Sequence, residues 1–279
     1  MNPKVSLYVP CYNCTKYLPA TLAGILNQTH APSEVIVVDD GSTDGLSSFL
    51  QSQPEYREVI LVRHARNKGL AAARNTGIRS SSYEIVAALD ADAIPSRDWL
   101  EKLLSYIDKG FAGAQGRLIE MNCGTIPDLW RCTHMAQGGP KLIVNPPYLY
   151  GNNTVFRKEY LTQGYDERCM TSGEDIDICK KIRARGGKLI YDPSVKVYHQ
   201  KKDSITSLAK TYWYYGHPIH SIGGEREFIW NLIRYTHFAT HHFVDDALHQ
   251  RIYFLPFDSV LWRLWIKQTV TVYKLSNRA

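Results

Sequence analysis

The sequence predicts an α/β protein: a mostly parallel, twisted sheet in a three-layer α/β/α sandwich, followed by a helical C-terminal extension. Short β-branched apolar runs alternate with amphipathic helical segments over about the first 110 residues. This alternation is typical of a parallel sheet covered by helices on both faces. From about residue 204 only helical patterns remain. We therefore expect a domain at 1–203, with halves at about 1–110 and 111–203, and a helical region at 204–279.

Each expected element follows from its local pattern. Strands are expected at 5–9, 34–40, 59–62 and 84–92, because each is a short apolar run followed by residues that break strands. Helices are expected between and after them, at about 18–26, 46–50, 69–78 and 99–107, from apolar residues spaced three or four apart. Further strands are expected at 112–119, 148–156, 188–193 and 195–199, with a loop at 138–147 and a helix at 174–187 that ends at glycines.

Composition narrows the class of protein. The 279 residues carry a formal net charge of +6, with 44% hydrophobic and 22% charged residues. These fractions are those of an ordinary globular protein, and the charge is too dilute for a nucleic-acid partner. We see neither a signal peptide nor an apolar run long enough to span a membrane. The expected location is therefore cytoplasmic, with peripheral contact at the inner face of the cell membrane kept as an extension.

Six cysteines are present, and the first two form a C-x-x-C pair at Cys11 and Cys14. A cytosolic chain of this size does not need disulfides. A structural zinc site usually has a second close pair, which this chain lacks. A thioredoxin-like redox pair would lie at a helix start after a strand, as this one does, so that alternative stays open until the neighbouring residues are considered.

Acidic residues gather where two expected strands end. Asp39 and Asp40 close the second strand, and Asp90 and Asp92 form a D-x-D at the end of the fourth. Ligands of open α/β sheets bind at the carboxyl ends of strands. Two like charges side by side favour a cation, and carboxylates suit Mg²⁺ or Mn²⁺, which often bridge protein to phosphate. The alternative for the D-x-D is that it caps a turn and the following helix.

These acids belong to an ordered set of motifs. The chain carries VPCYN, VVDDGSTD, NKGLAAARN, LDAD, GNNTVFRKE and GYDERCMTSGEDIDICKKI in that order. Each piece is weak alone, but the ordered set is specific. Over about residues 4–200 it resembles the family-2 glycosyltransferases, which are inverting enzymes with the GT-A fold. In this resemblance Cys11 and Cys14 fall at variable positions, so we treat the C-x-x-C as incidental.

The resemblance implies a nucleotide-binding set near the first two strand ends. Pro10, Tyr12, Asn13 and Asp40 would hold the base, with Asp39 in support; a carboxylate can accept an N–H from a uracil or guanine ring. The alternatives are a turn acid for Asp39 and a core aromatic for Tyr12.

A second part of this nucleotide-binding set opens the third helix. Asn67, Gly69 and Arg74 match the family's N-x-G-x-x-x-A-R-N motif. The resemblance places them near base or diphosphate, with Arg74 as the direct contact. The alternatives are a helix cap for Asn67 and a surface ion pair for Arg74.

The resemblance also implies a divalent metal, Mn²⁺ or Mg²⁺. Asp92 would bind it, and Asp90 would lie toward the ribose or the metal. His199, after the last strand, would lie near the metal and the diphosphate, because imidazole can ligate Mn²⁺ or donate to phosphate. The alternative for His199 is a polar residue at a strand end.

Catalytic roles fall on the E-D pair at the start of the helix at 174–187. The resemblance implies that Asp175 is the general base and that Glu174 shapes the acceptor site. Asn152 and Asn153 match a region that shapes the donor-sugar and acceptor pocket. The alternatives are dipole-complementing acids in a first helical turn and turn chemistry for the asparagines.

The C-terminal region is explained least by the resemblance. It holds six of the ten histidines: His217, His220, His237, His241, His242 and His249. His237 and His241 share a helix face but lack an evident third ligand, so packing is favoured. Trp213 could stack on an acceptor sugar or lie in the core. Residues 259–275 combine Trp with Arg and Lys, which suits an interfacial membrane helix or a dimer contact; packing on its own domain is the favoured alternative.

The function implied is metal-dependent, inverting transfer of a hexosyl or N-acetylhexosaminyl group. The donor would be a nucleoside-diphosphate sugar, with UDP favoured, and the acceptor a hydroxyl of a glycan or lipid-linked saccharide. A non-catalytic sugar-nucleotide-binding or scaffold protein is the alternative, and it predicts loss of the acids that are present here. An oxidoreductase would need G-x-G-x-x-G after the first strand, and a nucleotidyltransferase would need a basic glycine-rich loop there; neither motif is present.

Overall fold

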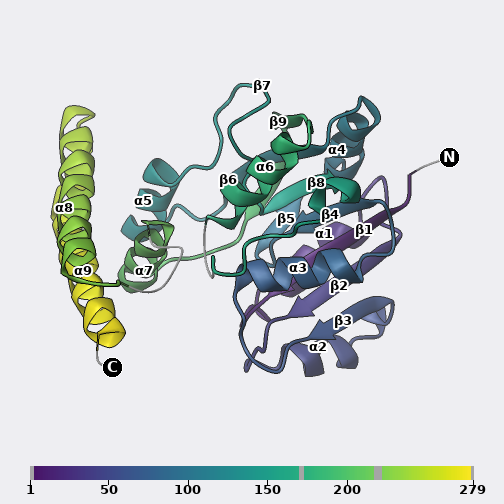
Figure 1. Ribbon diagram of the computed structural model, residues 1–279, viewed down its shortest axis with the longest axis horizontal. Helices are drawn as coiled ribbons and strands as arrows, with labels where there is room; N and C mark the ends of the chain where they lie inside the picture. The colour runs from purple at the N-terminus through teal and green to yellow at the C-terminus, as the bar shows by residue number, and fades with distance from the viewer. Residues whose placement is uncertain (1–2, 170–172, 217–221, 278–279) are drawn as a thin grey trace. The chain divides into compact units, whose positions relative to one another are not determined.

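The computed structural model describes residues 3–169, 173–216 and 222–277 (Figure 1). The chain divides into two compact units: Met1–Met121 with Gln137–Lys201, and Asn122–Ala136 with Lys202–Ala279. The second unit therefore takes a segment from the middle of the sequence, residues 122–136, which we had expected in the first domain. We call the first the sheet unit and the second the helical unit.

The sheet unit contains one nine-stranded sheet, with main order β3-β2-β1-β4-β8-β6-β9-β5 and β7 paired to β9. Its strands are β1 (Val5–Cys11), β2 (Glu34–Asp39), β3 (Val59–Arg63), β4 (Ile85–Leu89), β5 (Ala93–Pro95), β6 (Gly113–Glu120), β7 (Ile143–Val144), β8 (Asn153–Arg157) and β9 (Leu189–His199). The first four pair in parallel. β8 then runs antiparallel between β4 and β6, so the predicted parallel arrangement holds for the first half and the complete sheet is mixed.

Helices cover both faces of this sheet, as the predicted three-layer architecture requires. The sheet unit contains α1 (Leu18–Leu26), α2 (Leu46–Ser52), α3 (Leu70–Ser80), α4 (Trp99–Asp108) and α6 (Glu174–Ala184). Apolar residues of α1, α2 and α4 share one buried cluster with Leu7 and Val9. Those of α3 and α6 share another with Tyr8. Alternate β1 residues thus enter opposite layers, as strand geometry dictates.

Several element boundaries differ from those predicted. The fourth strand ends at Leu89 rather than Asp92, so the D-x-D forms the turn between β4 and β5. The two strands expected at 188–193 and 195–199 form the single strand β9, and the loop expected at 138–147 contains β7. Helix α5 (Ile126–His134) was missed, although Thr125 accepts the Asp128 N–H as an N-cap and a proline opens the helix.

The helical unit consists of α5, α7 (Ile205–Gly216), α8 (Glu225–Leu248), the short helix η3 (Ile252–Phe254) and α9 (Leu255–Ser276). Its core is aromatic, with Trp130, Trp213 and Trp265 fully buried beside Tyr235 and Phe254. Two of the buried indoles are hydrogen-bonded: the Trp130 N–H donates to Asp258 and the Trp265 N–H to the carbonyl of Ala209. Among the residues that the structure describes, no helix is long and apolar enough to cross a membrane.

Cys123 and Cys132 form a disulfide that clips α5 to the segment before it. We had not expected a disulfide, and such bonds persist mainly in oxidising compartments. This bond therefore counts against the cytoplasmic location that we expected. Cys11 and Cys14 are buried free thiols.

We predict that Gly77→Ala destabilises the sheet unit by about 2 kcal/mol, as an overpacked core does. A Cβ at Gly77 would lie 2.4 Å from the Tyr8 ring, which is itself buried. Alanine favours a helix interior by about 1 kcal/mol over glycine, so a loss of stability requires the overlap to dominate. Urea unfolding measures the change, and Gly139→Ala, where a Cβ meets nothing, is the control. Unchanged stability of Gly77→Ala would contradict the close packing of α3 on β1.

Candidate active site

The carboxyl ends of the parallel strands place the predicted residues at one edge of the sheet. β1 ends at Cys11, β2 at Asp39 and β4 at Leu89, so Tyr12, Asp40 and Asp90 are the next residues at neighbouring strand ends. This edge is where open α/β sheets bind ligands. The arrangement follows directly from the parallel register.

The segment after β1 turns sharply at Asn13, which has a left-handed φ of 51°. Its side chain accepts the N–H of Thr43 at 2.8 Å, and its own N–H donates to Ser42 at 3.0 Å. The turn leaves the Tyr12 ring 51% exposed, whereas Pro10 is buried in β1. Tyr12 is therefore not a core aromatic, and its ring face is open to a ligand.

Asp39 and Asp40 serve internal hydrogen bonds in this structure. Asp39 is fully buried and accepts from the N–H of Ser42 and the hydroxyl of Ser47. Asp39 thus matches the turn-acid alternative. The Asp40 carboxylate is also buried, and its hydrogen bonds organise the loop before α3.

The Asp40 carboxylate has three hydrogen-bond partners, two of which belong to that loop. The N–H groups of Lys68 and Gly69 each donate to it at 2.9 Å, and His64 Nδ1 lies 2.7 Å from it. Gly69 has a φ of 94°, which a residue with a Cβ rarely adopts, and it caps α3. Asn67 is exposed on the same loop. Both oxygens of Asp40 are engaged in these hydrogen bonds, and its direct contact with a base stays a prediction.

Arg74 is the centre of the charged site. Its guanidinium is 2% exposed and contacts three carboxylates. Nη1 lies 2.5 Å from Glu174 Oε1 and 3.1 Å from Asp175 Oδ1, and Nη2 lies 3.2 Å from Asp90 Oδ1. In this structure both Nη groups of Arg74 contact acids, and its direct contact with phosphate stays a prediction.

Burial dominates the electrostatics of the acids around Arg74. It raises the pKa of Asp90 despite the opposing charge of Arg74. It also raises the pKa of Glu174 well above its ordinary value, with the neighbouring Asp175 adding to the rise. Glu174 Oε2 and the Arg74 Nε are buried without a hydrogen-bond partner in the described structure. A cluster with excess negative charge and unpaired polar atoms is suited to a cationic or hydrogen-bonding ligand.

Asp175 is held from two sides at the start of α6. Its Oδ1 accepts from Arg74, and its Oδ2 accepts the N–H of Gly151 at 3.0 Å. A Cβ at position 151 would lie 2.1 Å from Arg74 Nη1, so any other residue there would displace the buried guanidinium. Asp175 remains partly exposed, so it combines a fixed orientation with access to a ligand. Glu174 is buried and contacts Arg74, and its expected role in shaping the acceptor site stays a prediction.

Asp92 and His199 meet at the end of β9. Asp92 Oδ2 lies 3.3 Å from His199 Nε2, and His199 Nδ1 lies 2.8 Å from Glu120. Burial would lower the pKa of His199, but its hydrogen bonds with Asp92 and Glu120 outweigh burial and raise it to about 9. Burial would likewise raise the pKa of Asp92, but His199 holds it below the usual range.

These donors fit a divalent cation. Carboxylate oxygens and a histidine nitrogen are ligands for Mn²⁺, and the second nitrogen of His199 already has the carboxylate partner that orients metal-binding imidazoles. Asp92 and His199 already face each other, whereas Asp90 is bonded to Arg74. The contact with Arg74 engages only Oδ1 of Asp90, and the side chain is 30% exposed.

Asn152 and Asn153 lie inside the sheet unit behind this edge. Both are buried, and Asn153 donates to Asn152 and accepts the N–H of Gly116. Asn152 bonds Gln137 as well. These bonds support the backbone of Gly151, which contacts Asp175.

Trp213 does not belong to this site. It is fully buried in the helical unit, where its ring stacks with Tyr235 and its N–H donates to Thr269. The core alternative is therefore correct for Trp213, because neither face of the ring is accessible to a sugar.

The sequence analysis missed several residues that shape the site. His64, Glu120 and Gly151 were not selected, because their partners are distant in sequence and only the folded chain brings them together. In the helical unit, His134, Asp245 and Asp246 form a cluster of potential metal ligands that we did not predict from the sequence.

That group in the helical unit already contains a cation. Arg251 bonds both Asp245 and Asp246, so its guanidinium neutralises the carboxylates that a metal would need. Of the histidines weighed from the sequence, His242 is buried against the Tyr212 hydroxyl, and His217 and His220 lie outside the described residues.

Comparison with known proteins identifies the family. Residues 6–164 match the family described as Glycosyl transferase family 2. The "Pre-mycofactocin glycosyltransferase" of Mycobacterium tuberculosis H37Rv is 32% identical over 194 residues, 65% of this chain and 40% of that protein. "Glycosyltransferase GlyA" of Streptococcus pneumoniae serotype 4 is 36% identical over 239 residues, 76% of this chain and 33% of that protein. The chain thus spans two fifths or less of the length of these relatives.

Solved structures share the fold at low sequence identity. The mannosyltransferase PcManGT from Pyrobaculum calidifontis, in complex with GDP-Man and Mn²⁺, has a TM-score of 0.58 and 23% identity, covering 98% of this chain and 74% of that one. GalNAc-T7 with UDP, GalNAc and Mn²⁺ has a TM-score of 0.59 and 18% identity, covering 84% and 51%. With the family match over more than half of its length, the chain belongs to glycosyl transferase family 2 and has the GT-A fold.

Proposed function

We propose that this protein is a metal-dependent, inverting glycosyltransferase that moves a sugar from a nucleoside-diphosphate sugar to an acceptor hydroxyl. The observation that carries the proposal is the contact of one buried Arg74 with Asp90, Glu174 and Asp175. It joins the D-x-D at the sheet edge to the candidate base on α6. A scaffold protein would have no need to keep this arrangement of acids.

For the donor we propose a nucleoside-diphosphate sugar, with UDP favoured. Solved structures with a similar fold are complexes with UDP, UDP-GlcNAc and GDP-Man. These complexes support a nucleoside diphosphate as the donor's leaving group, and two of the three contain uracil. The exposed ring of Tyr12 would stack on the base or ribose, and Asn13 and Asn67 lie on the two loops beside it. Asp40 would act by fixing the second of these loops.

For the cofactor we propose Mn²⁺ or Mg²⁺, held by Asp92 and His199 with Asp90 beside them. A bound cation would neutralise charge on the diphosphate leaving group. Glu120 would keep the His199 ring oriented by accepting a hydrogen bond from its Nδ1–H group, so that Nε2 faces Asp92.

For the chemical step we propose Asp175 as the general base. Its carboxylate would take the proton of the acceptor hydroxyl while that oxygen forms a bond to the anomeric carbon. The bond from that carbon to the diphosphate oxygen breaks on the opposite side, which inverts the centre. Arg74 and the Gly151 N–H hold the two oxygens of Asp175, so the base is oriented before the acceptor arrives.

For the acceptor we propose a glycan or a lipid-linked saccharide. Relatives include a "Chondroitin synthase" of Pasteurella multocida and a "Putative teichuronic acid biosynthesis glycosyltransferase TuaG" of Bacillus subtilis. These names favour a glycan or lipid-linked acceptor and a hexosyl or N-acetylhexosaminyl donor. We keep the cytoplasmic location as a proposal, which the Cys123–Cys132 disulfide opposes.

Donor binding is the first test. Titration calorimetry with UDP, GDP and dTDP, each with Mn²⁺ and with EDTA, should give binding of one nucleotide only when metal is present. We predict that Asp92→Asn weakens this binding at least tenfold, because it removes a charged ligand of the cation. Asp108→Asn, a surface change on α4, should bind as the wild type does. Unchanged metal-dependent binding by Asp92→Asn would refute the metal assignment, and no binding of any nucleotide would favour the scaffold alternative.

For Asp175→Asn we predict intact donor binding and a fall in the transfer rate of about 10²–10⁴-fold, the usual contribution of a general base. The matched control is Asp177→Asn on the same helix, which should transfer normally. Initial rates with a sugar acceptor, beside calorimetry with UDP and Mn²⁺, separate the two effects. Normal transfer by Asp175→Asn would remove it from the role of base.

The His199 ion pairs should make stability depend on pH when metal is chelated. In the folded protein the pKa of His199 is about 9, above its ordinary value of 6.5. The contribution of its ion pairs to the free energy of unfolding is therefore fully present below pH 6.5 and is lost as pH rises through 9. It amounts to roughly 3 kcal/mol at most. Urea unfolding in EDTA should therefore separate the wild type from His199→Gln most below pH 6.5 and least above pH 9. A difference that is the same at every pH would contradict the charged pairing.

A further inference from the structure

The helical unit turns an apolar stripe of α8 away from its own core. Residues such as Tyr235, His242 and Asp246 form the buried side of α8. Opposite them lie Ile229, Ile233, Val244 and Leu248, all exposed and Leu248 by 76%. The exposed His237, Thr240 and His241 separate the two apolar pairs on this side of the helix. Groups of large exposed apolar side chains often mark an interaction site.

The neighbouring helix α9 turns a cationic stripe in the same direction. Its buried side includes Leu261, Trp265 and Thr269. The opposite side carries Val260 and the cations Arg263, Lys267 and Lys274, all exposed. Because the only acid of α9, Asp258, is buried, every exposed charge on this helix is positive.

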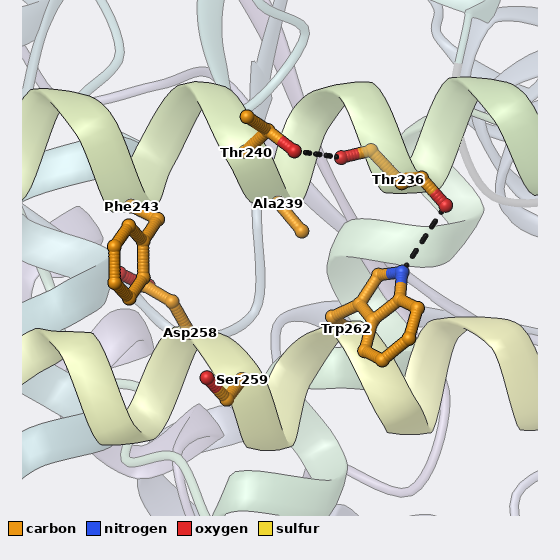
Figure 2. A pocket seen from close by; sticks show the side chains of 7 residues that line it. All are labelled: Thr236, Ala239, Thr240, Phe243, Asp258, Ser259 and Trp262. Atoms are coloured by element: carbon orange, nitrogen blue, oxygen red, sulfur yellow. Dashed lines mark hydrogen bonds between the residues drawn. The ribbon is translucent and has the colours of Figure 1, made fainter.

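The two stripes belong to one surface. α8 and α9 are joined by the short η3 segment and bury their inner sides in the same core, so the opposite sides of both helices face away from that core. Trp262 bridges the pair, since its N–H donates to Thr236 at 3.2 Å (Figure 2). A cavity of about 290 Å³ lies between the helices beside it, lined by residues such as Thr240, Phe243 and Ser259. We call this surface, with the 69% exposed Trp230, the outer face.

We propose that the outer face docks the protein on an anionic lipid membrane. Apolar side chains with Trp at their border enter the headgroup region, and the Arg and Lys residues contact acidic headgroups. A second copy of the chain suits this face less well. The exposed acids of α8, Glu225 and Glu227, lie in its first turn, so self-pairing leaves the middle of α9 without opposite charge. The inference does not depend on the proposed transfer activity.

The test is sedimentation of the full chain with vesicles of phosphatidylcholine alone or mixed with phosphatidylglycerol. We expect binding to the anionic vesicles only. The double change Arg263→Glu and Lys267→Glu should weaken it at least 30-fold, since each cation near such a surface contributes about a factor of five and the added acids repel the anionic headgroups. The control, Lys109→Glu with Lys180→Glu, makes the same change in net charge at exposed positions of the sheet unit and should bind as the wild type does.

The apolar part is tested by Ile233→Ser with Val244→Ser, which should reduce vesicle binding at least tenfold while circular dichroism stays unchanged. If a variant fails to fold, quenching of wild-type Trp fluorescence by lipids with brominated acyl chains decides the matter. Four results would overturn the proposal: no sedimentation of the wild type, equal loss in the control, sedimentation without quenching, or a solution dimer that the serine changes dissociate without any vesicle binding.

Discussion

The buried guanidinium of Arg74 is the interaction on which the site depends. It links Asp90 at the end of β4 with Glu174 and Asp175 at the start of α6, although these acids lie far apart in the sequence. Without a buried cation, three carboxylates so close together would repel and lose their charge. The Arg74 side chain therefore positions Asp175, the candidate base, close to Asp90 of the D-x-D. The requirement for glycine at position 151 follows from the same side chain.

The parallel half of the sheet supplies the frame for this interaction. Strands β1, β2 and β4 run in the same direction, so their following loops meet at one edge. Asp39 and Asp40 then stabilise those loops by hydrogen bonds to backbone and side chains. The antiparallel β8 beside β4 brings Gly151 and Asn152 to the same edge. The exposed Tyr12 follows β1, and Asp92 contacts His199 at the end of β9.

The inner and outer sides of the helical unit differ in composition. Its inner sides form an aromatic core, whereas its outer face combines apolar and cationic side chains. A helix that is apolar on two opposite sides has a second partner besides its own core. The proposed catalysis and the proposed membrane contact thus belong to separate units, and each can be tested by substitutions that leave the other unit's core intact.

The sequence alone determined the family, the α/β layers and most residues at the sheet edge, because strand periodicity and ordered motifs are local properties. Asp90, Asp92, Asp175 and His199 could be placed near one another by this means. Only the tertiary structure decided which groups pair: it placed Arg74 among acids, turned Glu174 inward and buried Trp213. It also revealed Glu120, His64 and α5's place in the helical unit. These depend on contacts between residues distant in sequence, and burial sets their energy, so no local pattern encodes them.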